Sequence, residues 1–524
     1  MPTGHCLAAR DVPAERALEV ERMLKEEGVS PLQMRLVRGR DRRYPTGALE
    51  IFGTWGRIEG DEPEPLPRDG LELLAERVFD DQDLGLAACE PAAYAFMVQR
   101  NHALGRTQYY LGRREAETPP RVVTTLDLDL LRTVRRELTG VMEEHDPAVA
   151  MAIVIDLERG DVLAVDSLEK YPVQPFAPVY YAFTPGSTFK LLTMAVALEE
   201  GKVRPDERFD VGDGRAYHLP DCKRWIREAE GSRSGVITAA ECFAYSVNIG
   251  LVLIGQRLDP EVFRGKLREL GYGTAPNAGL GPEHPGLIPP LPWKKNWELA
   301  SVSFGHEVMT TLWQHATGLS AVVRGGVLRP LRLISAVEQN GVRHEIPLDP
   351  GRRVFSAETC ATIREMMSMG ASVGTGRKVA RADLVMGTKT GTAEKVPTEI
   401  CAHVAGAARQ AAQEAGRPFT GKDYQRLAGV PKPHGRKSCY TSSMCIVGRP
   451  VEGGREIMVL LVVDEPTGKA KFGSDVAGPA AARILAEALG RTVDGTEVVP
   501  VLGNGFALAS ETGQNPEVEP WRAR

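Results

Sequence analysis

The segment that fixes the architecture is Thr184-Pro185-Gly186-Ser187-Thr188-Phe189-Lys190, which leads directly into a mostly apolar run at residues 191–198. Pro185 and Gly186 are typical turn residues. The run behind them would be apolar on every side of a helix, and such a helix is buried. Gly201 is a suitable residue to end it. The sequence therefore predicts a buried helix that begins with Ser187 and Lys190 one turn apart on the same face.

Ser187 and Lys190 in this arrangement indicate nucleophilic catalysis. The positive end of a helix dipole, together with partial burial, favours a neutral lysine. A neutral lysine beside a serine hydroxyl can act as the general base that makes the serine a nucleophile. Taken alone, the pair also has an ordinary structural explanation, in which Ser187 caps the helix and Lys190 reaches solvent. The catalytic interpretation therefore depends on partner residues elsewhere.

Length and composition limit the classes of function. The 524 residues suffice for two or three domains, and 43% hydrophobic with 25% charged residues is ordinary for a globular protein. A net charge of −5 gives no electrostatic reason to expect a nucleic-acid partner. The longest apolar runs fall far short of the roughly 20 residues of a membrane helix, and residues 1–10 lack the apolar core of a signal peptide. These features alone favour a soluble chain.

The cysteines and histidines predict neither a metal site nor a cofactor. The eight cysteines are scattered without a Cys-x-x-Cys pair, which argues against zinc. Their usual role would be that of buried thiols, although Cys401 and Cys439 could staple a loop; the count does not decide the redox compartment. His306-Glu307 is not followed by a histidine at metalloprotease spacing.

A change in composition near residue 140 divides the chain. Residues 1–140 are charged and are expected to form a smaller non-catalytic domain, with a strand at 122–126 and a helix at 127–138 near its end. Residues 141–490 are expected to form the second domain, and residues 491–524 a loosely ordered tail.

The second domain mixes strands and helices, with a polar insertion at residues 395–438. Its predicted strands are 150–155, 162–165, 385–394, 444–447 and 457–463. Its predicted helices are 191–198, one beginning at the capping box of Thr238, 310–323, one from Ser356 to about Gly370, 401–415 and 479–489. This order of elements predicts a mixed α and β domain.

Two further motifs supply the partner residues on which the catalytic interpretation of Ser187 and Lys190 depends. Ser246-Val247-Asn248 and then Lys389-Thr390-Gly391-Thr392 follow it along the chain. Each is weak alone, since Ser246 could cap a helix, Asn248 could lie in a turn, and Lys389 could protect an edge strand. Together and in this order, the three motifs resemble those of the penicillin-recognising serine transferases and β-lactamases.

The resemblance extends to class B penicillin-binding proteins over about residues 30–490. The segments that resemble this family are 43–45, 70–72, 124–127, 303–307, 374–376 and 464–466. The resemblance implies an α+β fold: a transpeptidase domain with an antiparallel sheet flanked by helices, preceded by a dimerisation or pedestal-like domain. The segment after Thr392 leans towards the division-type transpeptidases.

The resemblance also implies roles for the motif residues. Ser187 would attack the carbonyl between the two D-alanines of a peptidoglycan stem peptide and form an acyl-enzyme, with Lys190 as its base and Ser246 as the proton relay to the leaving D-alanine. β-Lactams, which mimic the D-Ala-D-Ala end, would acylate Ser187. No cofactor would be needed.

Asn248 and the lysine motif would bind the substrate. Asn248 would bind the substrate backbone, and Lys389 with the hydroxyls of Thr390 and Thr392 would hold its terminal carboxylate. Gly391 would let the substrate lie against the strand. The oxyanion hole would consist of the backbone N–H groups of Ser187 and Thr392.

Partners and location follow from the same resemblance. They would be a glycan polymerase and division or elongation proteins, at the extracytoplasmic face of the inner membrane. The sequence lacks the family's anchor, which suggests a truncated start or an unusually short protein. Two other departures are Thr388, in place of the family's usual glycine, and the long insertion at 395–438.

Three other functions compete with the transpeptidase. A class D β-lactamase has a similar first motif, but its second motif resembles Ser-x-Val, whereas this chain has Asn248. A β-lactam sensor would keep the pocket without the transfer reaction. A catalytically silent division scaffold would likewise keep the pocket without the transfer reaction.

Overall fold

The computed structural model describes residues 121–491 with short gaps, and a small part of the preceding chain. The gaps are 172–175, 221, 230–231, 340–341, 396–400, 428–429 and 431–437, and the earlier described residues are 51, 70, 71, 73, 74, 94–101 and 106–113. The paired strands β1 (Tyr94–Asn101) and β2 (Arg106–Arg113) belong to this earlier part. Most of the expected non-catalytic domain and the expected tail after Arg491 lie outside the described residues.

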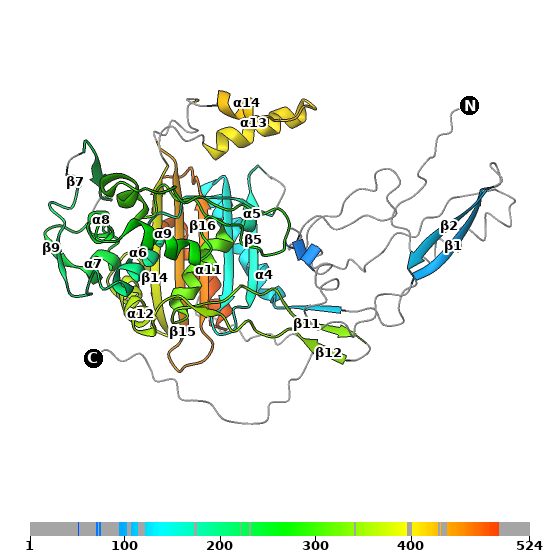
Figure 1. Cartoon of the computed structure of the whole chain (residues 1–524), viewed down its shortest axis with the longest axis horizontal. Coiled ribbons are helices and arrows are strands. Elements are labelled where there is room, and N and C mark those ends of the chain that lie inside the picture. Colours follow the sequence, from blue (N-terminus) through cyan, green and yellow to red (C-terminus); the bar gives the residue numbers. More distant parts are fainter. Residues whose placement is uncertain are drawn as a thin grey trace.

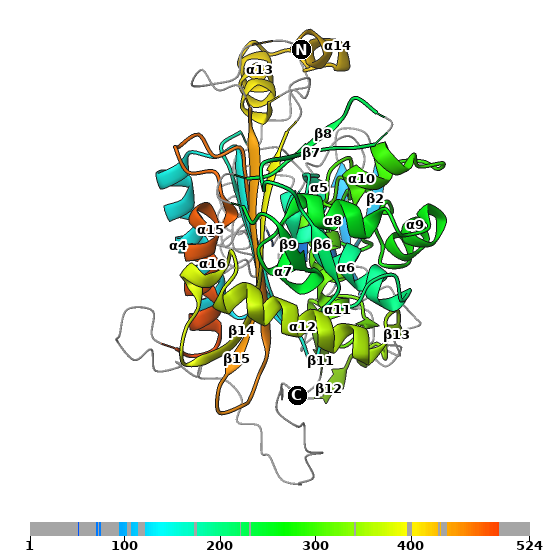
Figure 2. The same ribbon diagram turned by 90° about the vertical axis from the view of Figure 1, so that its left-hand side faces the viewer.

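A five-stranded antiparallel sheet forms the centre of the described domain (Figure 2), as predicted. Its strands in spatial order are β14 (Leu384–Glu394), β15 (Tyr440–Pro450), β16 (Ile457–Asp464), β4 (Val149–Asp156) and β5 (Val162–Glu169). Each adjacent pair is antiparallel. All five strands were predicted, β14 from its β-branched content, and β14, with the lysine motif, is an edge strand.

Helices cover both faces of this sheet, and this explains why its central strands β4 and β16 are almost continuously apolar. Side chains alternate between the two faces along a strand. Along β4, Met151 and Ile153 pack into one buried cluster and Ala152 and Val154 into the other. A sheet with only one covered face would show polar residues at every second position.

One face is covered by α4 (Leu128–His145), α15 (Gly473–Val476) and α16 (Gly478–Ala488) (Figure 2). The Asp127 side chain caps α4 by accepting from the N–H groups of Asp129 and Leu130 at 3.0 Å each. The apolar positions of the predicted helix, among them Val134 and Leu138, are fully buried. The helix α4 runs through residue 140, where the sequence predicts a domain boundary, and packs on the sheet.

The other face carries the helices around the predicted buried segment (Figures 1 and 2). They are α5 (Ala177–Tyr180), α6 (Lys190–Glu199), α7 (Ala239–Ala244), α8 (Asn248–Gly255), α9 (Pro260–Glu269), α10 (Ala300–Val302), α11 (Leu312–Val323) and α12 (Ala357–Ser372), with the single turns η3 (Gly186–Phe189) and η4 (Lys295–Leu299). A further turn, η5 (Arg377–Val379), packs with α16 on the first face. Residues 190–197 of α6 are buried, which confirms the prediction.

Short strands complete the domain. They are β3 (Arg121–Thr124), β11 (Ile334–Gln339) and β12 (Val342–Glu345) in one sheet, and the pairs β6 (Arg208–Asp210) with β9 (Val236–Thr238), β7 (Ala216–His218) with β8 (Trp225–Arg227), and β10 (Val327–Leu328) with β13 (Arg352–Arg353). The predicted capping box after β9 is present: Glu241 N donates to Thr238 Oγ1 at 3.2 Å, and Thr238 N donates to Glu241 Oε2 at 2.8 Å.

The insertion connects β14 to β15 and holds α13 (Ala402–Glu414) and α14 (Gly421–Arg426). Both views place these helices at one end of the sheet, beyond the ends of β14 and β15 (Figures 1 and 2). At its base, Lys395 N donates to Cys439 O at 2.9 Å, which continues the pairing of the two strands.

No helix in the described part of the chain is both long enough and apolar enough to cross a membrane.

Candidate active site

The three motifs lie on three separate elements that the fold brings together. Ser187 lies in η3 and Lys190 is the first residue of α6, whereas Ser246 lies between α7 and α8. The lysine motif lies in β14. The turn η3 packs on this strand so closely that a Cβ atom at Gly186 would lie 2.8 Å from the Ala393 Cβ.

The turn that carries Ser187 is held from several sides. Gly186 has a φ of +55°, which favours glycine, and its N–H donates to Gly305 O at 3.1 Å. A Cβ at Gly305 would lie 2.0 Å from Gly186 O, so glycine is required there as well. The Thr188 hydroxyl donates to Pro185 O at 2.9 Å. Because its backbone and its neighbours are fixed, the turn presents Ser187 in one orientation.

A buried histidine braces the same turn and was missed by the sequence argument. His315 Nε2 lies 2.8 Å from Thr188 Oγ1, and its Nδ1 lies 2.7 Å from the Tyr272 hydroxyl. Burial lowers the pKa of His315 to about 3, so the imidazole is neutral and has one donor and one acceptor nitrogen. No motif marks a histidine with this role.

Lys190 is fully buried and directs its amine at the second motif. Its Nζ lies 2.6 Å from Ser246 O, 3.3 Å from Ser246 Oγ and 2.7 Å from Asn248 Oδ1. Burial lowers its pKa to about 8, and the nearby carboxylate of Glu228 opposes this shift. A lysine with a pKa near 8 is partly neutral at physiological pH, which a general base requires.

Ser246 lies between the two lysines of the site. Its Oγ lies 2.8 Å from Lys389 Nζ and 3.3 Å from Lys190 Nζ. Its φ is +60°, a left-handed conformation that is uncommon for a residue other than glycine. Such strained residues cluster at functional sites, where the surrounding structure enforces them.

Lys389 is buried without an anionic partner. Its Nζ also donates to Thr390 O at 3.1 Å and lies 5.6 Å from the centre of the Phe243 ring. Within the described residues, neither Lys389 nor Lys190 forms an ion pair, which is unusual for buried lysines. Burial, and then the charge of Lys190, lower the pKa of Lys389. An incoming carboxylate would relieve this unpaired charge.

The threonines of the third motif form hydrogen bonds beside this amine. Thr390 Oγ1 lies 2.6 Å from Thr375 Oγ1, and Thr392 Oγ1 accepts from Gly473 N at 3.0 Å. The Thr392 hydroxyl proton therefore stays free for another acceptor. Thr375 is an addition to the predicted site; it lies in segment 374–376, which the sequence marked only as a resemblance.

Glycines explain two features of β14. A Cβ at Gly391 would lie 2.1 Å from Ser443 Oγ and 3.1 Å from Pro185 O, so packing of the nucleophile turn requires glycine there. This differs from the predicted reason, which was access for the substrate. The bulk of Thr388 is accommodated by Gly376, where a Cβ would lie 2.0 Å from Thr388 Oγ1.

This packing predicts a strong effect of Gly391→Ala. The added methyl would push the strand away from the turn, and we expect acylation by penicillin to slow by about tenfold or more, because ångström displacements at a reacting centre have effects of this size. The matched control is Gly421→Ala, since no atom lies within 4 Å of its added Cβ. Equal acylation rates for the two variants would contradict this packing argument.

Glu228 is the second residue that the sequence argument missed. Its carboxylate accepts from Asn248 N at 2.9 Å and from Ile249 N at 2.5 Å, and thereby caps the start of α8. The adjacent carbonyl of Arg227 accepts from Asn248 Nδ2 at 2.9 Å. These contacts orient the Asn248 side chain, whose oxygen bonds Lys190. No sequence pattern identifies this long-range cap.

Glu228→Gln is predicted to shift the pH profile of acylation to lower pH. Lys190 must be neutral to act as a base, so the rate should rise with pH through its pKa of about 8. The charge of Glu228 favours the protonated amine, and its removal therefore lowers this pKa. The measurement is the second-order rate of penicillin acylation against pH, with Glu261→Gln in the first turn of α9 as the control. An acid limb that stays in place or moves upward would contradict the role of Glu228.

The Ser187 hydroxyl itself has no hydrogen-bond partner among the described residues, and it is half-buried. The sequence argument expected Lys190 directly beside it, whereas Lys190 directs its donors to Ser246 and Asn248. Catalytic hydrogen bonds are often long before the substrate binds. The predicted site residues thus come together, with Ser246 as the link between the lysines.

The antiparallel sheet is flanked by helices, and its edge strand lies beside a Ser-x-x-Lys turn and a Ser-x-Asn loop. This arrangement is typical of the penicillin-recognising proteins.

Comparisons with known proteins show similarity to this class. Residues 150–406 match the family model of the penicillin binding protein transpeptidase domain. The chain is 30% identical over 306 residues to penicillin-binding protein PbpB of Mycolicibacterium smegmatis, covering 55% of this chain and 47% of PbpB. It is 27% identical over 315 residues to peptidoglycan D,D-transpeptidase FtsI of Escherichia coli K12, covering 57% of this chain and 50% of FtsI.

A solved structure agrees with these matches. The apo transpeptidase domain of Burkholderia pseudomallei penicillin-binding protein 3 has a TM-score of 0.53 and 25% identity, covering 70% of this chain and 95% of that domain. Residues 150–406 are thus similar to penicillin binding protein transpeptidase domains, and the chain resembles class B penicillin-binding proteins, with relatives of the division type. It spans about half the length of the curated relatives that it matches.

Proposed function

We propose that this protein is a serine D,D-transpeptidase that cross-links peptidoglycan stem peptides through an acyl-enzyme at Ser187. The observation that supports this most strongly is the position of Ser246 Oγ, 2.8 Å from Lys389 Nζ and 3.3 Å from Lys190 Nζ. One hydroxyl between a base and an anion-binding amine is what acyl transfer to a peptide with a terminal carboxylate requires. The similarity to FtsI of Escherichia coli, a peptidoglycan D,D-transpeptidase, supports the same reaction.

Acylation begins with removal of the Ser187 proton. Neutral Lys190 accepts this proton while the Ser187 oxygen bonds to the carbonyl carbon between the two D-alanines. The backbone N–H groups of Ser187 and Thr392 receive the developing oxyanion, and each such donor contributes about 3 kcal/mol to stabilising the transition state. The peptide C–N bond then breaks, and Ser246 passes the proton from Lys190 to the leaving D-alanine nitrogen.

The substrate is held by its carboxylate and its backbone. The carboxylate pairs with Lys389 and accepts from the hydroxyls of Thr390 and Thr392. Because Lys389 is buried without an ion-pair partner among the described residues, a bound carboxylate would favour the protonated form of its amine and pair with it. Asn248 donates to or accepts from the peptide backbone of the substrate.

The acyl-enzyme is resolved by an amine from a second stem peptide. This amine attacks the ester carbonyl, its proton returns through the Ser246 and Lys190 relay, and the ester C–O bond breaks to restore the Ser187 hydroxyl. The product is a new peptide bond that joins the stem peptides of two glycan strands. With a β-lactam the leaving group stays attached, so Ser187 remains acylated.

Intact-mass measurement after exposure to benzylpenicillin tests this proposal. We expect the mass to rise by one benzylpenicillin, with the modified peptide containing Ser187. Rapid turnover of a chromogenic cephalosporin without a stable adduct would indicate the alternative β-lactamase. A stable adduct without cross-linking of lipid-linked substrate, in the presence of a glycan polymerase, would indicate a sensor or a silent scaffold.

Partners and location follow from the proposed reaction. The donor and acceptor stem peptides exist outside the cytoplasm, so we place the protein in the cell envelope at the extracytoplasmic face of the inner membrane. A glycan polymerase supplies the strands to be cross-linked, and division or elongation proteins position the pair. β-Lactams are the expected inhibitors.

A further inference from the structure

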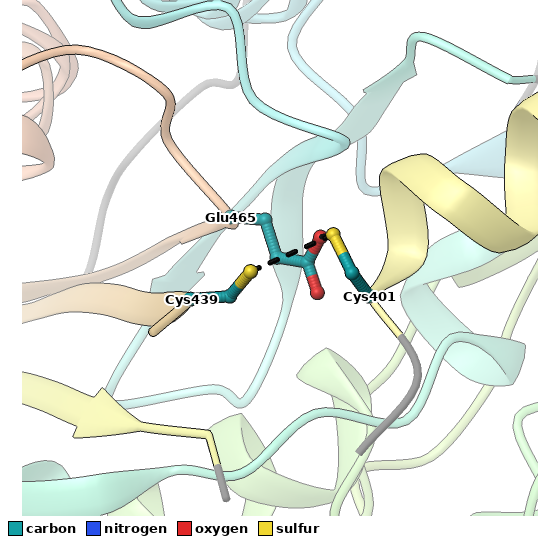
Figure 3. Close-up of side chains that lie close together, drawn as sticks. All are labelled: Cys401, Cys439 and Glu465. Carbon is teal, nitrogen blue, oxygen red and sulfur yellow. Dashed lines mark hydrogen bonds between the residues drawn. The ribbon is translucent and has the colours of Figure 1, made fainter. Parts of the chain in front are cut away.

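Two thiols meet at the base of the insertion, beside the end of the active-site strand. Cys401 precedes α13 and Cys439 precedes β15, and their sulfur atoms lie 3.5 Å apart (Figure 3). Both are buried, with exposures of 4% and 6%. Neither is part of a disulfide in this structure. The two cysteines thus bracket almost the whole inserted segment.

The hydrogen bonds around Cys401 and Cys439 allow both thiols to lose their protons. The Cys439 thiol donates to Cys401 Sγ, and the Cys401 thiol donates to Glu465 Oε2 at 2.7 Å. The same oxygen accepts from His403 N at 3.2 Å, and Oε1 accepts from Lys395 Nζ at 2.9 Å. If both thiols lost their protons, each oxygen of the Glu465 carboxylate would still accept a hydrogen bond from another donor. No buried polar atom of Glu465 would be left unsatisfied.

We propose that Cys401 and Cys439 form a disulfide that closes the base of the insertion. The inference rests on the proposed function only through location, because an extracytoplasmic compartment is oxidising. The oxidant is a small-molecule or protein disulfide. One cysteine thiolate attacks it to form a mixed disulfide and releases one thiol; the second thiolate then attacks, forming the Sγ–Sγ bond and releasing the other thiol. Two protons and two electrons leave the pair.

A metal ion fits the same cluster less well. Cys401, Cys439 and Glu465 offer three ligand atoms that lie within 4.8 Å of one another, and no fourth ligand joins them among the described residues. Structural zinc sites bind four protein ligands. The ammonium of Lys395, 2.9 Å from Glu465 Oε1 and 2.7 Å from Asp464 Oδ2, already forms ion pairs with both carboxylates.

The bond would fix the insertion to the strand that carries the lysine motif. Strand β14 ends at Glu394, which pairs with Tyr440, the residue next to Cys439. Lys395 N donates to Cys439 O. A covalent link between Cys439 and the start of α13 therefore keeps α13 against this end of the sheet. In the reduced protein, non-covalent contacts alone hold α13 in this position.

Thiol mapping of the full chain tests the proposal. The protein is equilibrated with oxidised glutathione or with dithiothreitol, alkylated after denaturation, and digested. We expect a linked Cys401–Cys439 peptide in the oxidised sample, lighter by two hydrogen atoms than the two reduced peptides together. We also expect proteolysis within α13 and α14 to be at least about tenfold slower in the oxidised form.

The controls separate the possible outcomes. Cys401→Ser should remove the linked peptide, while Cys360→Ser, at a buried thiol in α12, should leave it. Full alkylation of both cysteines after oxidation, or a link to another cysteine, would overturn the proposal. So would protection of both thiols that is lost on adding a chelator, together with bound zinc. Because the readout is a mass, it is independent of whether Ser187 is acylated.

Discussion

Ser187→Ala is expected to abolish covalent labelling by penicillin. The variant lacks the oxygen that forms the ester, and nucleophile removal in serine enzymes lowers turnover by about 10³-fold or more. The rest of the site should stay intact, since the Ser187 hydroxyl makes no hydrogen bond with a described residue and its removal leaves no partner unsatisfied. Gel fluorescence with a fluorescent penicillin, followed by mass mapping, is the measurement.

Ser372→Ala is the matched control for this loss. Ser372 is an exposed serine at the end of α12, and its hydroxyl forms one weak contact with Met369 O at 3.4 Å. Labelling should equal that of the unaltered protein. Persistent labelling of Ser187→Ala on another residue would move the nucleophile elsewhere and remove the basis of the proposed reaction.

Lys190→Met should have the second largest effect, a loss of acylation rate of about 10²- to 10⁴-fold. Methionine keeps most of the buried volume, so the change removes the amine with little loss of packing. Without that amine the Ser187 proton has no base, and Ser246 loses one of its two charged neighbours. The rate is measured by mass spectrometry over a time course of penicillin exposure.

The control for Lys190→Met is Lys202→Met, at an exposed position shortly after the same helix. Thermal unfolding of both variants shows whether the fold is kept. If Lys190→Met folds normally and is acylated at the rate of the control, Lys190 is not the base. The pH profile adds a second test, because the acid limb near pH 8 should disappear with the lysine.

Sequence patterns predicted the elements of this domain well because their signals are local. The buried run at residues 191–198, the capping box at Thr238 and the apolar strands are each visible within a short window. The residues Ser187, Lys190, Ser246 and Lys389 could be identified because their motifs have fixed spacing within each segment. Three motifs in a fixed order then implied that the fold brings them together.

The parts that were missed depend on contacts between distant segments. Glu228 reaches the start of α8 from a different element, and His315 braces the nucleophile turn from α11. Gly391 is required by the neighbouring Pro185 and Ser443, which sequence spacing does not reveal. The change in composition near residue 140 lies within α4, whose packing on the sheet a composition change does not reveal.

The central claim is that the nucleophile turn, the Ser246 loop and the lysine motif act on one bound substrate. The most direct test is a crystal structure of the protein after reaction with benzylpenicillin. The account predicts an ester on Ser187 Oγ, with the drug's carboxylate on Lys389 and the hydroxyls of Thr390 and Thr392. An acyl group on another residue, or a carboxylate bound away from Lys389, would contradict it.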